Sequence, residues 1–133
     1  MPIVPGTANG IIVVNNKSYQ GVDIINLSLK FKNGKQVSMM ADSGLEGFRE
    51  RYNAAGVGKD ELGSLDIGIN PNIKFIPGSR MEAYMASGLV SLSIGANAWA
   101  GGTNTSTYNS VFFLPNTTMK VDGKIIIQNG NLK

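Results

Sequence analysis

A set of short turns constrains the fold of this chain more than any other feature. Asn-Gly pairs stand at 9–10, 33–34 and 129–130, and an Asp-Gly pair stands at 122–123. These residue types tolerate the positive φ that two-residue hairpin turns require. The pair at 33–34 separates the runs DIINLSLKF and KQVSMMA, and the pair at 122–123 separates TMKV from KIIIQ. The sequence therefore predicts antiparallel hairpins around these two pairs.

The run before the first of these hairpins alternates between apolar and polar residues. Ile25, Leu27, Leu29 and Phe31 are separated by single residues, the period of a strand with one buried face. Further strands are expected around 64–69, around 73–76, in the run LVSLSIG and in the run SVFFLP.

Two short segments have helical rather than strand periodicity. In DSGLEGFRERYN, residues 42–53, the apolar residues Leu45, Phe48 and Tyr52 lie on one helical stripe. In GSRMEAYMASG, residues 78–88, Met81, Tyr84 and Met85 form a similar face. Each segment begins with a Ser-x-x-Glu pattern typical of a capping box, Ser43 with Glu46 and Ser79 with Glu82.

The length and the order of these segments predict one α+β domain over residues 1–133, mostly antiparallel β with two short helices. A chain of 133 residues is long enough to bury a core of its own. We find no internal repeat and no break in composition that would suggest a second domain.

Composition excludes several classes of function. The chain contains no histidine and no cysteine, so a Ser-His pair, a thiolate nucleophile and imidazole or thiolate metal ligands are all absent. The net charge is +3, and the basic residues are scattered, which argues against a nucleic-acid partner. No apolar run is long enough to span a membrane, and no secretory leader opens the chain. We therefore expect a cytoplasmic setting, no membrane and no nucleic acid.

Few side chains remain as candidates for chemistry. Asp42, Glu46 and Glu50 would share an exposed helical face, and Asp60, Glu61 and Asp66 form the other acidic cluster, whose oxygen ligands could make a weak cation site. Trp99 could stack on a sugar ring or cover the edge of a core. The loop GGTNTSTYNS, residues 101–110, resembles a turn that presents polar groups from the end of a strand, yet it contains no carboxylate or imidazole.

Several runs together resemble a known family. LGSLDIGINPNI, SGLVSLSIGAN, GGTNTSTYNSVFF and TTMKVDGKIIIQNG follow one another from Leu62 onward, and VPGTANGIIVVNN precedes them. This order resembles the C-terminal domain of the metal-dependent aminopeptidases of the aminopeptidase T and aminopeptidase S type, a thermophilic metallopeptidase family. The resemblance covers about Val4 to Gly130.

The resemblance implies a metal site whose ligands are replaced here. Members of the family hold two divalent metals with glutamate, histidine and aspartate, and remove N-terminal residues from peptides. The matching positions carry Ser64, Ser91, Asn109 and Val111, and the family's remaining ligand and catalytic glutamate fall upstream of the matched region. Neutral side chains cannot neutralise a catalytic divalent ion. We therefore predict no catalytic residue, no metal and no cofactor.

Three hypotheses for function follow. The first is a non-catalytic relative, or isolated C-terminal domain, of an aminopeptidase T-like protein that acts as a scaffold or association domain. Its partner would be a second copy in a homo-oligomer or a missing N-terminal domain. The second is a part of a metal-dependent aminopeptidase whose ligands come from an absent segment; the chain alone would be inactive. The third is a module that binds a peptide or sugar in the vacated cleft through Trp99, Asn104, Tyr108 and Asn109.

Overall fold

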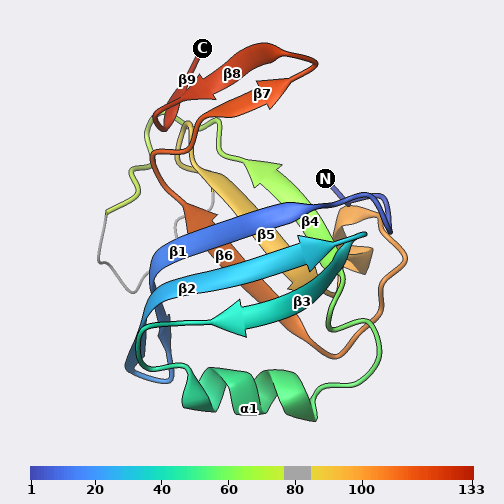
Figure 1. Cartoon of the computed structure of the whole chain (residues 1–133). Helices are drawn as coiled ribbons and strands as arrows, with labels where there is room; N and C mark the ends of the chain where they lie inside the picture. Colours follow the sequence, from blue (N-terminus) through green and yellow to red (C-terminus); the bar gives the residue numbers. More distant parts are fainter. Residues whose placement is uncertain (77–84) are drawn as a thin grey trace. The chain divides into compact units, whose positions relative to one another are not determined.

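The computed structural model of this chain describes residues 1–76 and 85–133, which form three three-stranded sheets (Figure 1). The first sheet contains β1 (Gly10–Tyr19), β2 (Val22–Lys32) and β3 (Lys35–Met40). The second contains β4 (Leu62–Ile67), β5 (Val90–Gly95) and β6 (Asn109–Leu114). The third contains β7 (Met119–Val121), β8 (Lys124–Gln128) and β9 (Asn131–Leu132). The described helices are α1 (Glu46–Ala54) and the short 3-10 helix η1 (Ala98–Ala100).

The predicted α+β class with two helices is wrong, because the described chain is mostly antiparallel β and α1 is its one α-helix. Most of the second predicted helix, 78–88, lies outside the described residues. Its described end is not helical, since Met85 has φ +78° and Ala86 pairs with Asn70 across an isolated bridge. A residue with left-handed backbone cannot continue a right-handed helix.

The chain divides into two compact units. The first comprises Met1–Ser64 with Ser93–Phe112, and the second comprises Leu65–Leu92 with Phe113–Lys133. Strands β4, β5 and β6 each contribute residues to both units. The prediction of a single domain over 1–133 stays a prediction.

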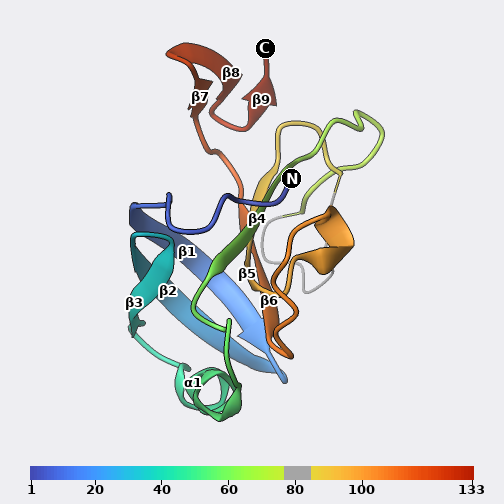
Figure 2. The same cartoon turned by 90° about the vertical axis from the view of Figure 1, so that its right-hand side faces the viewer.

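The core of the first unit lies under one face of the first sheet and beside α1. Val14, Leu27, Leu29 and Phe31 from this sheet are 5% exposed or less. Of the predicted stripe, Leu45 and Phe48 are buried and Tyr52 is partly buried. Phe48 meets Phe112 of β6 edge to face, with 6.2 Å between ring centroids. Helix α1 lies next to β3, on the side of β3 that faces away from β2 (Figures 1 and 2).

Two-residue turns set the hairpin registers, as predicted. The turns at 33–34 and 122–123 have both residues at positive φ, and they place Lys32 opposite Lys35 and Val121 opposite Lys124. The pair at 129–130 makes a third such turn, between β8 and β9. A fourth such turn, Gln20–Gly21 between β1 and β2, has no clear sequence signal, because glutamine is not a typical residue for positive φ. The pair at 9–10 makes no hairpin and leads into β1 instead.

The alternation predicted for β2 is correct only beyond residue 26. Leu27, Leu29 and Phe31 face the core, but Ile24 is fully buried and Ile25 is only partly so. Asn26 has φ +51°, which interrupts the pleat and reverses the order of inward and outward side chains. The bend lets the backbone of Ile25 pair with Ser43.

That pairing explains why the predicted capping box does not form. Ser43 is held as the bridge partner of Ile25, and Gly44 follows with φ +78°. The residue that precedes α1 is Leu45, and no side chain caps the helix. The strand expected around 73–76 is also wrong, since Ile73 and Ile76 are exposed and lie outside any described strand.

Within residues 1–76 and 85–133, no helix is long and apolar enough to cross a membrane. The α-helix found there, α1, has nine residues, whereas a span of the hydrocarbon core takes about twenty.

The turn at Gly34 provides a stability test. Gly34 has φ +79°, and a Cβ there would lie 2.6 Å from the backbone nitrogen of Gly6. Gly101 has φ +87° in the same unit, with no atom within 4 Å of such a Cβ. We expect Gly101→Ala to cost about 1–2 kcal/mol, the strain of left-handed backbone. Gly34→Ala should cost roughly 1–3 kcal/mol more through overpacking. Urea unfolding followed by circular dichroism measures both, and equal losses would contradict the close approach.

Candidate functional site

The polar loop after β5 is organised around the buried side chain of Asn97. Its Nδ2 donates to the carbonyl of Gly63 at 3.0 Å, and its Oδ1 accepts from the backbone N–H of Asn104 at 2.8 Å. Asn97 is 5% exposed. A buried amide needs such partners, so this side chain closes the loop onto the beginning of β4.

Asn104 makes a second set of contacts of the same kind. Its Nδ2 donates to the Gly58 carbonyl at 2.9 Å and to Oε2 of Glu61 at 3.3 Å. Its Oδ1 accepts from the N–H of Ser106 at 2.9 Å. The amide therefore ties the loop to the segment after α1, and both of its N–H donors are used.

The paired glycines serve the same loop. Gly101 follows η1 with φ +87°, a left-handed cap. A Cβ on Gly102 would lie 2.3 Å from the side-chain amide of Asn97. Glycine is therefore required at 102 to admit that amide. The sequence suggested that this loop presents polar side chains at its surface. In the structure, Asn97 and Asn104 instead hydrogen-bond to the loop backbone and to neighbouring segments.

Three of the four positions that the sequence resemblance predicts to replace metal ligands have internal contacts. Ser64 is fully buried on β4, with its Oγ 2.8 Å from the Oγ of Ser93. Asn109 begins β6 and donates from Nδ2 to the Ala96 carbonyl at 2.9 Å. Val111 is half-buried, and its carbonyl accepts from Nζ of Lys17 at 2.8 Å. These three belong to the first unit, whereas Ser91, buried on β5, belongs to the second.

The acidic cluster does not assemble either. In the described part of the chain no three acidic side chains lie together as ligands for a metal ion. Glu61 accepts from Asn104, and Asp60 accepts a short hydrogen bond from the Tyr52 hydroxyl. Asp66 lies in the other unit.

Two tyrosines near these groups are held in their neutral form. Burial raises the pKa of Tyr52 well above its ordinary value, and the hydrogen bond to Asp60 raises it further. Burial also raises the pKa of Tyr108, although the Ser110 hydroxyl and the Arg51 guanidinium oppose this shift. Neither phenol can act as a phenolate base near neutral pH.

The four residues predicted to bind a sugar or peptide are therefore not all available to a ligand. Tyr108 is 2% exposed and Asn104 and Asn109 are committed to the loop. Trp99 is 64% exposed on η1, and its Nε1 donates to the Ala96 carbonyl at 3.3 Å. It covers no core, contrary to one of the two interpretations of this residue.

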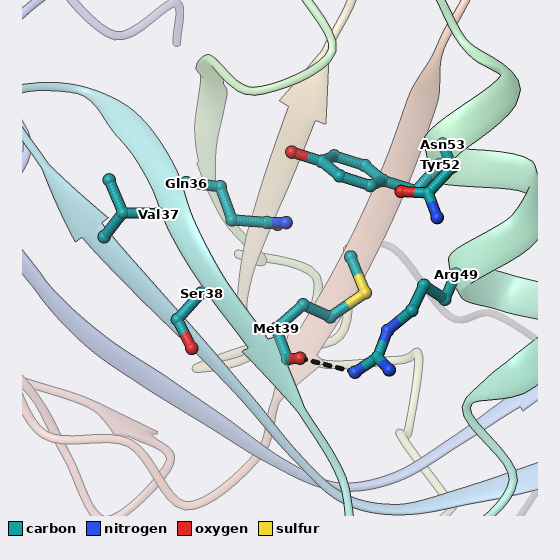
Figure 3. Close-up of a pocket in the computed structure, with 7 residues that line it drawn as sticks. All are labelled: Gln36, Val37, Ser38, Met39, Arg49, Tyr52 and Asn53. Atoms are coloured by element: carbon teal, nitrogen blue, oxygen red, sulfur yellow. Dashed lines mark hydrogen bonds between the residues drawn. The ribbon is translucent and has the colours of Figure 1, made fainter.

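The structure instead shows a shallow groove of about 220 Å³ between β3 and α1. Gln36 and Met39 enter it from β3, and Arg49, Tyr52 and Asn53 border it from α1 (Figure 3). Nη2 of Arg49 donates to the carbonyl of Met39 at 2.8 Å, a contact that links the two walls.

Sequence reasoning did not identify this groove. Its one available signal was the spacing on α1, because Arg49, Tyr52 and Asn53 are three and four residues apart and share a helical side. That Gln36 lies opposite them depends on how α1 packs beside β3, which the sequence does not show.

No protein-family model matches the chain, and no curated protein is significantly similar to it in sequence. Among solved structures, the chain is similar to 2,5-dihydroxypyridine dioxygenase from Pseudomonas putida KT2440, with a TM-score of 0.74 and 18% identity. The match covers 96% of this chain and 41% of the dioxygenase chain, so this chain spans less than half of that protein's length. At this identity the likeness concerns the fold alone.

The role of the loop amides can be tested by truncation. Asn97→Ala leaves the Asn104 N–H without its partner and removes one of the two hydrogen bonds to the Gly63 carbonyl, which keeps the one from the Ile3 N–H. We therefore expect a loss of about 1–3 kcal/mol in the free energy of unfolding. Thr105→Ala, at an exposed position of the same loop, should change it by less than about 0.5 kcal/mol. Urea denaturation compares the two variants. If both unfold like the wild type, the loop does not depend on Asn97.

Proposed function

We propose that this chain is a non-catalytic relative, or isolated C-terminal domain, of an aminopeptidase T-like metallopeptidase, and that it acts as a scaffold or association domain. The family assignment rests on the sequence resemblance described above. The non-catalytic assignment is supported by the chemistry of the matching positions. Serine, asparagine and valine cannot supply the charge that a two-metal centre needs.

The packing of these positions supports the same proposal. Ser64 is fully buried against Ser93, and the Asn109 amide donates to the backbone. Recruiting either to a metal would break a hydrogen bond inside the first unit, at a cost of about 1–3 kcal/mol for each buried group left unpaired.

The association role is supported by the outer face of the first sheet. Ile11 and Val13 of β1 and Met40 of β3 are 63%, 54% and 61% exposed. Val13 and Met40 are both paired with Ser28, so they lie in one row across the sheet, and Ile11 lies two residues along the same face of β1. A solvated sheet face normally carries polar side chains, and exposed apolar clusters mark surfaces that bind partners.

Lys30 lies beside this cluster, opposite Ile11. The partner that we propose is a second copy of the chain or an adjoining N-terminal domain, and such a domain should present an apolar surface with an acidic edge. The expected compartment is the cytoplasm.

The metal hypothesis gives the first test. After dialysis against Zn²⁺, Co²⁺ or Mn²⁺, the purified chain should retain no stoichiometric metal and should not hydrolyse leucine p-nitroanilide, because its matching positions lack charged ligands. A metal-loaded aminopeptidase in the same buffer is the control. Tight binding of one or two ions, with metal-dependent turnover, would favour the enzymatic alternative.

Charge placed on the exposed sheet face gives the second test. Val13→Lys should weaken self-association by at least about tenfold, because a lysine would be buried without a partner in the interface. Val57→Lys is the matched control, since Val57 is 96% exposed on a loop of the same unit and should not change association. Sedimentation equilibrium measures both. A wild-type chain that stays monomeric at about 100 µM would contradict a second copy as the partner.

A further inference from the structure

We propose that the groove between β3 and α1 binds a small carboxylic acid that also carries one hydrogen-bond donor, a hydroxy acid or an amino acid. The groove is separate from the apolar sheet face, because Ile11, Val13 and Met40 do not line it. The inference is therefore independent of the association role.

The size of the groove limits the ligand to a few carbon atoms. Its volume of about 220 Å³ is below the roughly 300–1,000 Å³ of pockets that enclose drug-sized molecules. The Met39 side chain and the Tyr52 ring supply apolar surface for a short aliphatic chain (Figure 3).

Arg49 supplies the charge for a carboxylate. Within the described residues its guanidinium makes one hydrogen bond, to the Met39 carbonyl, and no ion pair. A guanidinium has five N–H donors in a planar fork that matches a carboxylate. Asn53 lies one helical turn along α1, and its side-chain amide has no hydrogen bond in the same part of the chain. It can donate to the second carboxylate oxygen.

Gln36 supplies an acceptor for the second group of the ligand. Its side chain is only 8% exposed, and its Oε1 is buried without a hydrogen-bond partner among the described residues. A buried acceptor in this state is destabilising. Because this oxygen has almost no exposed surface, the amide must rotate about its last side-chain bond to turn Oε1 toward the groove, where a hydroxyl or ammonium group of the ligand would satisfy it.

The charge of the groove favours a monoanion over a phosphate. Arg49 is the one charged side chain among the residues that line it. One guanidinium neutralises a carboxylate, whereas a phosphate carries close to two negative charges at neutral pH and would be left undercompensated.

The backbone contacts of β3 favour a small ligand over an added peptide strand. β3 is an edge strand, but its outer side is closed at both ends of the groove. The N–H of Gln36 donates to the Asp60 carbonyl at 2.7 Å, and the Met39 carbonyl accepts from Arg49. A strand could pair with this edge only by displacing both contacts.

Four isosteric probes test the proposal by NMR titration of backbone amides: α-hydroxyisocaproate, leucine, isocaproate without a donor, and leucinamide without a carboxylate. We expect shifts at residues 36–39 and 49–53, with millimolar affinity because Arg49 is exposed. One or both of the first two probes should bind more tightly than isocaproate, and leucinamide should bind most weakly. Which of the two binds more tightly tells whether the ligand is a hydroxy acid or an amino acid.

Three variants separate the parts of the site. Arg49→Gln should weaken carboxylate binding by about tenfold. Gln36→Met should abolish the preference over isocaproate. Lys124→Gln removes one exposed charge from β8, outside the groove, and should change affinity by less than about twofold. No shifts up to about 50 mM probe, leucinamide binding as tightly as leucine, or equal effects of Arg49→Gln and Lys124→Gln would overturn the proposal.

Discussion

Positive φ at two-residue turns is the constraint on which the rest of this fold depends. Each turn sets the pairing of the residues beside it, and a strand that slips by one residue exchanges its buried and exposed faces. The turns at 20–21 and 33–34, together with the reversal of the pleat at Asn26, therefore place Leu27, Leu29 and Phe31 in the core of the first unit. The same pairing leaves Ile11 and Val13 on the opposite face. The burial pattern and the candidate interaction surface thus both follow from residues with positive φ.

The polar loop after β5 shows how a turn rich in amides can be mistaken for a binding site. Asn97 and Asn104 each satisfy backbone groups from segments distant in the sequence, and Gly102 has no side chain where the Asn97 amide lies. Such groups are satisfied before any ligand arrives, so their number says little about binding. The groups that remain unsatisfied are more informative, and in the groove these are the Gln36 oxygen and the free donors of Arg49.

Function in this chain is therefore best sought away from the four positions that the proposed resemblance assigns to metal ligands. Those positions are neutral, and the contacts of Ser64 and Asn109 are internal to the first unit. The outer face of the first sheet and the groove beside β3 lie in the same unit and differ in chemistry. The first is apolar and suits a macromolecular partner, whereas the second is polar, cationic and small. They need not serve the same purpose.

The sequence by itself determined the turns at 33–34 and 122–123, the buried stripe of α1 and the absence of imidazole and thiolate chemistry. The turns and the stripe depend on residues close together in the chain, and the missing chemistry follows from composition, so the sequence is enough to predict them. Only the tertiary structure decided that Ile24 replaces Ile25 in the core, that Ser43 pairs with a strand instead of capping a helix, and that Gln36 faces Arg49 across a groove. Each of these depends on the approach of segments far apart in the sequence, where backbone pairing and packing outweigh local preference.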